Sequence, residues 1–97
     1  MIKLALWVAL EAKPGKEKDL EDFLEVGRIL SEAEPKTISW YAVKLGPASY
    51  AVFDTFETED GRDAHLSGRI ANALMEQAPE LLASPPEIRK AHVIAAK

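Results

Sequence analysis

The residues best suited to chemistry lie in segment 49–66, SYAVFDTFETEDGRDAHL, where a strand-like aromatic run leads through acidic residues into a helix that carries His65. His65 is one of two histidines in a chain without cysteine. Imidazole is the side chain that most readily exchanges a proton near neutral pH. Two interpretations stay open: His65 transfers protons in a reaction, or a nearby carboxylate such as Asp60 or Asp63 simply holds it in place.

A group of polar residues follows His65 at helical spacing. Arg69, Asn72 and Glu76 continue it at intervals of four, three and four residues, so an unbroken helix would align these side chains on one face. That face is either the rim of a pocket or ordinary solvated surface. Aromatic residues of the preceding segments are suited to the wall of such a pocket, or else pack in the core; they are Trp40, Tyr41, Tyr50, Phe53 and Phe56.

Several other kinds of site lack the residues they need. No cysteine is present and neither histidine has a partner at metal-binding spacing, so we expect no disulfide and no metal site. There is no glycine-rich phosphate loop and no serine in a nucleophile elbow. The formal net charge is −4, with lysine and arginine scattered among acids, which argues against nucleic-acid binding.

The N-terminal apolar run, residues 4–10, is too short to span a membrane. Glu11 and Lys13 follow it, where a signal peptide would have a small-residue cleavage site. We therefore expect no membrane segment. Because chains without cysteine are common in the cytoplasm, that is the location we predict.

Hydrophobic periodicity indicates the elements that must position these residues. Alternation predicts four strands, at 2–10, 37–45, 49–57 and 87–96. Helical spacing predicts a helix over 16–30 and a second helical region that begins after an N-cap at Thr58 and is interrupted near Gly68. Gly46 and Pro47 supply a turn that joins the second and third strands as a hairpin.

This order of elements predicts a ferredoxin-like α+β fold in one domain, 1–97: a four-stranded antiparallel sheet with the helices on one face. The first strand would then turn Lys3, Ala5, Trp7 and Ala9 toward the other face. An apolar second face left in water would form an unusually large exposed patch. We therefore predict a homodimer through sheet-to-sheet packing.

Four segments resemble the antibiotic biosynthesis monooxygenase family of dimeric α+β barrel proteins: AKPGKEKDLEDFL, PKTISWYAVK, FDTFETEDGRDAHL and ELLASPPEIRKAHV. The resemblance implies that O₂ oxidises a small electron-rich aromatic substrate, a phenol or hydroquinone, without metal, flavin or another cofactor. His65 matches a histidine early in the family's second helix, which implies a general base or an oxyanion donor. The implied pocket wall and rim consist of Trp40, Tyr41, Tyr50, Phe53, Phe56, Arg69 and Asn72.

Three alternatives to this enzyme remain. A haem-binding or haem-degrading relative of the same fold would use His65 as axial ligand, although such relatives carry a first-strand asparagine and this chain has none before Asn72. A dimeric binding protein would hold a small aromatic ligand without changing it. A purely structural dimer would fill the pocket with its own side chains. Unlike the binding protein and the structural dimer, the monooxygenase requires His65 to face the pocket.

Overall fold

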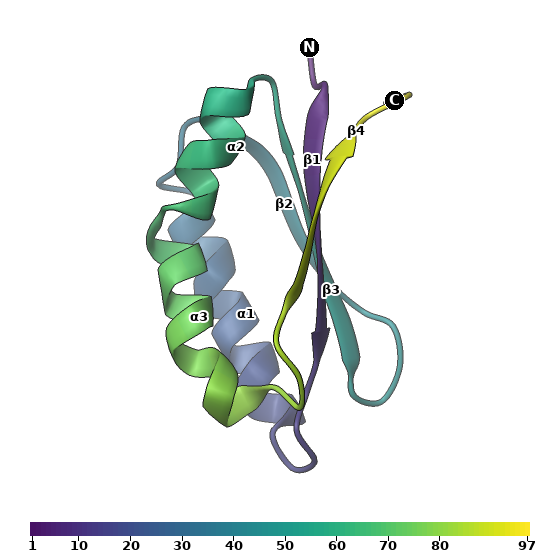
Figure 1. Ribbon diagram of the computed structural model, residues 1–97, viewed down its shortest axis with the longest axis vertical. Helices are drawn as coiled ribbons and strands as arrows, with labels where there is room; N and C mark the ends of the chain where they lie inside the picture. Colours follow the sequence, from purple (N-terminus) through teal and green to yellow (C-terminus); the bar gives the residue numbers. More distant parts are fainter.

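A four-stranded antiparallel sheet covered on one face by three helices makes up the computed structural model, which describes residues 1–97 (Figure 1). Along the chain the elements are β1 (Leu4–Glu11), α1 (Glu17–Ser31), β2 (Thr37–Lys44), β3 (Ser49–Phe56), α2 (Glu59–Leu66), α3 (Arg69–Leu81) and β4 (Glu87–His92). The strands lie in the order β2-β3-β1-β4. The predicted ferredoxin-like α+β fold is thereby confirmed.

The two faces of the sheet differ in what covers them. Four side chains of β1 point toward the helices and are buried: Leu4, Leu6, Val8 and Leu10. Between them, Trp7 points to the other face and contacts Phe53 of the neighbouring β3, with ring centroids 6.5 Å apart. No helix lies on this outer face (Figure 1), as the alternation in the first strand predicts.

Two apolar clusters hold the helices on the sheet. The larger one joins α1 and α3 to the middle of the sheet and includes Leu20, Leu24, Leu81 and Val52. The smaller one lies at the other end, where Leu4, Leu6 and Phe56 are packed against Leu66 of α2. Full burial of each such side chain stabilises the fold by about 1.5–3 kcal/mol. Between Val52 and Phe56, the helix-facing row of β3 contains a single charged residue, Asp54, and its side chain is fully buried.

The second helical region begins and breaks as the sequence predicts. The Thr58 hydroxyl accepts a hydrogen bond from the backbone N–H of Gly61 at 3.1 Å and so caps the start of α2. The helix ends at Leu66, and α3 starts in a new direction after Gly68. The alignment expected for an unbroken helix is therefore not formed: His65 is buried, while Arg69 and Asn72 are exposed.

The last strand is shorter than the sequence pattern suggests. We predicted a strand over 87–96, whereas β4 ends at His92. The reason is its neighbour, because β1 begins at Leu4 and this residue is already paired with His92. One further backbone hydrogen bond, from Val93 N–H to the Lys3 carbonyl at 2.8 Å, closes the ladder. None of the helices combines the length and the apolar character that crossing a membrane requires.

Candidate active site

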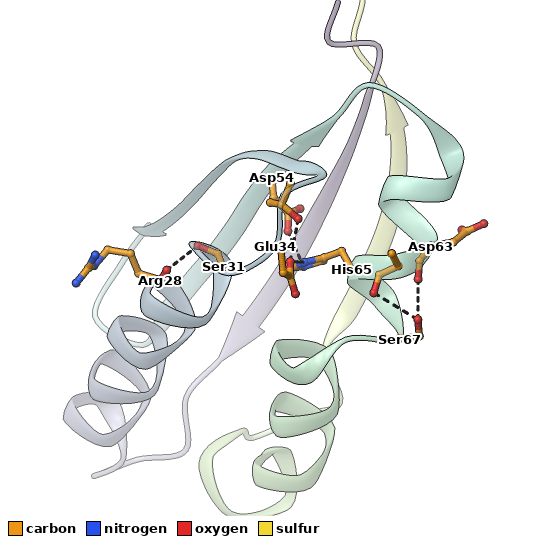
Figure 2. A network of polar contacts seen from close by, with 9 residues as sticks. Arg28, Ser31, Glu34, Asp54, Asp63, His65 and Ser67 are labelled. Atoms are coloured by element: carbon orange, nitrogen blue, oxygen red, sulfur yellow. Dashed lines mark hydrogen bonds and ion pairs between the residues drawn. The ribbon is translucent and has the colours of Figure 1, made fainter.

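His65 lies between two carboxylates that come from distant parts of the chain (Figure 2). Its Nδ1 atom is 2.6 Å from Oε1 of Glu34, and its Nε2 atom is 2.8 Å from Oδ2 of Asp54. The imidazole therefore has one acid on each side, and neither of them is the Asp60 or Asp63 considered from the sequence. This arrangement links α2, β3 and the connection between α1 and β2.

Local packing holds each of the three residues in place. Asp54 is fixed by the ladder of β3, and the ring of Phe56 lies 5.5 Å from the imidazole centroid of His65. Glu34 follows the end of α1 and also accepts a hydrogen bond from the Thr37 hydroxyl at 2.8 Å. Gly68 allows Glu34 to approach, because a Cβ atom at this glycine would lie 3.0 Å from Oε2 of Glu34.

The two acids decide the charge of the imidazole. Burial disfavours imidazolium and by itself lowers the pKa of His65, whereas the contacts with Asp54 and Glu34 raise it. The carboxylates outweigh burial, so the pKa of His65 is raised above its ordinary value of 6.5. The two carboxylates therefore favour a positively charged His65 more than water does.

Asp54 is the least satisfied polar group of the site. Its side chain is 0% exposed, and its Oδ1 atom has no hydrogen-bond partner in the protein. Its Oδ2 atom is at ion-pair distance from Nε2 of His65, but it lies off the direction of the ring N–H and makes no well-formed hydrogen bond. A buried carboxylate with free acceptor capacity is costly. It can accept a proton or a hydrogen bond from a ligand.

An apolar cavity of about 90 Å³ lies between the helices and the sheet, and Asp54 and His65 contribute to its wall. Most of the remaining wall consists of aliphatic side chains from the strands and helices. The indole of Trp40 completes it, and the Nε1 atom of this indole is buried without a hydrogen-bond partner. Trp40 and Asp54 are cross-strand partners, so their side chains leave the same face of the sheet next to each other.

A glycine in α1 makes room for this indole. A Cβ atom at Gly27 would lie 3.1 Å from Cζ2 and 3.2 Å from Cη2 of Trp40. The close approach of helix and indole therefore requires glycine at this position. It sets the position of the part of the cavity wall that the indole forms beside Asp54.

The predicted site residues fall into two groups. His65 and Trp40 line the cavity. The other six do not line it. Tyr41 and Phe53 are on the outer face of the sheet, because they are paired one residue out of phase with Asp54. Arg69 and Asn72 are exposed on α3.

The other two aromatic residues point toward the helices but serve the core. Tyr50 is buried in the larger cluster and donates a hydrogen bond from its hydroxyl to Glu21 of α1 at 2.5 Å. Phe56 is completely buried in the smaller cluster, next to the imidazole of His65. It therefore supports the site from behind without lining the cavity.

Asp54 and Glu34 are the residues that the sequence did not identify. A signal for Asp54 exists, since it interrupts a helix-facing row that is otherwise made of Tyr50, Val52 and Phe56. Glu34 offers no such signal, because it is one acid among several around the end of α1. The two acids lie on opposite sides of the ring and do not surround a common point. No group of three histidine, aspartate or glutamate side chains in the structure is arranged to hold a metal ion.

Comparisons with known proteins connect this geometry to relatives. No protein-family model matches the chain, and no curated protein is similar to it in sequence. Among solved structures, the NE2512 protein of unknown function from Nitrosomonas europaea is 55% identical over 100% of this chain and 94% of that one, with a TM-score of 0.97.

More distant solved structures share the fold. Rv0793 from Mycobacterium tuberculosis is 16% identical, with 97% of each chain covered and a TM-score of 0.86. A putative antibiotic biosynthesis monooxygenase from Nitrosomonas europaea is 13% identical over 95% of this chain and 90% of that one, with a TM-score of 0.84. The chain thus belongs to one family with the NE2512 protein and has the fold of the antibiotic biosynthesis monooxygenases, the group that its sequence resembles.

Proposed function

We propose that the protein is a cofactor-independent monooxygenase that oxidises a small electron-rich aromatic compound, a phenol or hydroquinone, with O₂. The observation that carries this proposal is the fully buried carboxylate of Asp54, which has a free oxygen atom and lines a cavity that is otherwise largely apolar. Such a site favours a neutral ring with one acidic hydroxyl. It also provides a group that removes the proton.

The substrate hydroxyl is placed between two polar groups. It donates a hydrogen bond to Oδ1 of Asp54, and the indole N–H of Trp40 donates one to an oxygen of the ring. The cavity of about 90 Å³ is small. A cavity of about 150 Å³ holds benzene, so a ring enters only when a side chain at the rim moves. Met75 lines the cavity and is 57% exposed, and we assign this movement to it.

The reaction needs little from the protein beyond deprotonation and shelter. The O–H bond of the substrate breaks, its proton goes to Asp54, and the electron pair stays on the phenolate oxygen. The phenolate gives one electron to O₂, and the two radicals recombine as a ring peroxide. Cleavage of the O–O bond leaves one oxygen atom on the ring as a quinone carbonyl, while the other leaves as water with two hydrogens of the substrate. The apolar wall keeps bulk water from these intermediates.

His65 acts together with Asp54 in this scheme. With both ring nitrogens engaged, the imidazole has no free lone pair for the substrate. Its positive charge compensates the phenolate as that charge develops. The catalytic group expected from the sequence thus becomes a pair, in which Asp54 takes the proton and His65 supplies the countercharge.

We further propose that two copies pair through the outer face of the sheet. This face bears the ring pair Trp7 and Phe53, and Tyr41 beside them is 60% exposed. Val43, on the same face of β2, is 39% exposed. Packing this face against its copy would remove about 800 Å² per partner from water in an interface of standard size.

The test is oxygen uptake by purified, metal-free protein with single-ring hydroquinones and phenols and with larger anthrone-like phenols. We expect uptake above autoxidation with the single-ring compounds. Asp54→Asn should lower kcat by about 100-fold or more, because an amide does not accept the proton. The matched control is Asp63→Asn, which removes an exposed acid of α2 that does not reach the cavity and should leave the rate unchanged.

Two results would count against the enzyme. Equal rates for Asp54→Asn and the parent protein would remove Asp54 from the mechanism. No uptake with any compound, combined with saturable binding of the same compounds, would favour the binding protein of the same fold.

A further inference from the structure

His65 borders two separate spaces. On its Nε2 side lies the apolar cavity with Asp54. On its Nδ1 side lies a hollow of about 360 Å³ at the protein surface, which Glu34, Lys36, Gly68 and Arg69 help to line. The same imidazole is therefore part of the wall of both spaces. Figure 2 shows the side chains of Asp54, His65 and Glu34 gathered at one place.

Exposure rises in steps along the row of Asp54, His65 and Glu34. The side chain of Asp54 is 0% exposed, that of His65 is 7% exposed and that of Glu34 is 21% exposed. Each step is bridged by a contact of 2.8 Å or less between an imidazole nitrogen and a carboxylate oxygen. The outer contact, from Nδ1 of His65 to Oε1 of Glu34, is a hydrogen bond of 2.6 Å, a length over which a proton passes between side chains. The row leads from the apolar cavity to the surface.

We propose that Glu34 is the proton carrier of this site: it passes a proton between Nδ1 of His65 and water in the surface hollow, so that the buried pair of Asp54 and His65 exchanges protons with bulk solvent. This inference rests on the proposed function, in which Asp54 receives a substrate proton. It adds a residue that does not touch the substrate and acts through His65.

In each proton transfer one bond to hydrogen breaks and another forms. The substrate O–H bond breaks and an O–H bond to Asp54 forms. The Nδ1–H bond of His65 then breaks and an O–H bond to Glu34 forms, and Glu34 gives this proton to water. No electrons leave the substrate in these steps. The proton that reaches water leaves one negative charge on the buried site, and the phenolate carries it. The same path in reverse restores the imidazolium when Asp54 returns its proton to the reduced oxygen.

The charges around His65 are compatible with this path. Asp54 from β3 and Glu34 from the connection before β2 contact the ring directly. Lys36 and Arg69 line the same surface hollow as Glu34, while Asp60 and Asp63 of α2 are exposed and make no contact with the ring. The two cations offset the charge of Glu34 and attract hydroxide to the hollow, which favours release of a proton there.

Several contacts also fix the position of the Glu34 side chain. Its Oε1 atom accepts hydrogen bonds from both the Thr37 hydroxyl and His65, and glycine at position 68 leaves space for Oε2. These contacts hold the carboxylate beside Nδ1 while part of it remains in water. A residue needed only to neutralise His65 would not have to reach the surface.

The test measures how fast the Nδ1 proton of His65 exchanges with water, by NMR exchange spectroscopy on ¹⁵N-labelled protein without substrate. In Glu34→Gln the amide keeps the size of the side chain but does not carry the proton, and we expect exchange to slow by roughly 100-fold. Glu32→Gln is the matched control, because Glu32 is paired with Arg28 and not with His65. It should leave exchange unchanged.

A second variant separates proton transfer from positioning. Thr37→Val keeps the carboxylate of Glu34 and removes the hydrogen bond that fastens it, and we expect exchange to stay within a few-fold of the parent protein. Unchanged exchange in Glu34→Gln would overturn the proposal, and so would slowing in Thr37→Val as large as in Glu34→Gln. The readout needs no turnover, so a failure of the oxygen-uptake test leaves this result independent.

Discussion

At the scale of single residues, the site depends on one cation shared by two anions. Taking His65, Asp54 and Glu34 out of water is costly, and the close contacts on both sides of the ring offset this cost. Removing one partner leaves an unbalanced charge, which in buried pairs typically costs about 3–5 kcal/mol. The arrangement is therefore sensitive to the protonation state of its central residue.

Stability should depend on pH through His65. Its pKa is raised in the folded protein, so the folded chain binds the proton of His65 more tightly than the unfolded chain does. The resulting stabilisation is complete below the unfolded pKa of about 6.5 and is lost as the pH rises through the raised folded pKa. We expect the free energy of unfolding of the parent protein, relative to His65→Gln, to fall as the pH is raised from 6 to 9.

Urea unfolding of both proteins at a series of pH values measures this difference, in which the contributions of other groups largely cancel. An advantage of the parent protein that grows with rising pH would contradict the predicted charge of His65.

His65 itself could be predicted from the sequence as a site residue, but its partners could not. Asp54 is 11 residues away and Glu34 is 31 residues away along the chain. From the sequence, the expected partners are Asp60 and Asp63, which lie on the same helix. Which acid meets a histidine is decided by the pairing of strands and the path of a turn, and residue types alone do not contain that information.

At the scale of the elements, the contact between α1 and β2 shapes the cavity. Gly27 lets the helix lie directly on the indole of Trp40, and the buried Nε1 atom of the indole belongs to the cavity wall. Glycine in a helix is less favourable than alanine by about 1 kcal/mol. The close packing offsets this preference.

A pair of substitutions tests this contact. Gly27→Ala should destabilise the protein by about 1 kcal/mol, because overpacking costs about 1–3 kcal/mol and the better helix former returns about 1 kcal/mol. In a Trp40→Phe background the nearest ring atoms are gone, and the same alanine should stabilise the protein. Chemical unfolding of the four proteins gives the coupling energy between the two positions. Equal effects of alanine in both backgrounds would show that Trp40 does not limit this position.

Element types and most boundaries follow from the sequence, for identifiable reasons. The alternation in β1, the cap at Thr58 and the break at Gly68 are local signals, and the structure contains all three. The end of β4 is different, since it depends on where the neighbouring β1 begins. The face that each side chain takes is likewise set by the sheet register, so residue types alone do not show that Tyr41 and Phe53 lie on the outer face, away from the cavity beside Asp54.

At the scale of the whole molecule, the sheet has one covered and one uncovered face (Figure 1). The uncovered face bears exposed Tyr41 and Val43 beside the Trp7 and Phe53 pair. Apolar groups gathered on one face of a sheet mark an interaction surface. The covered face contains the cavity, so the two faces have separate tasks in the proposed dimer.

Charge placed on the uncovered face should separate the dimer. In Tyr41→Glu the new carboxylates would meet near the interface without partners, and we expect sedimentation velocity to show a monomer where the parent protein is a dimer. Ile29→Glu is the matched control, because Ile29 is 54% exposed on α1 and far from the outer face. A Tyr41→Glu protein that stays dimeric would place the interface elsewhere.

Overall topology was accessible from the sequence because few arrangements fit the order of elements with short connections. The cavity was not, since its volume depends on how side chains of all seven elements meet. One methyl group added at Gly27 is enough to change the cavity, and one added at Gly68 is enough to change the position of Glu34.

The two tryptophans of the chain are divided between the two faces of the sheet. Trp7 belongs to the outer face with Phe53, whereas Trp40 borders the cavity beside Asp54. Indole fluorescence responds to polarity and to quenching groups within a few ångströms. The protein therefore has two built-in optical reporters, so that emission from Trp40 follows occupation of the cavity and emission from Trp7 follows events at the opposite surface.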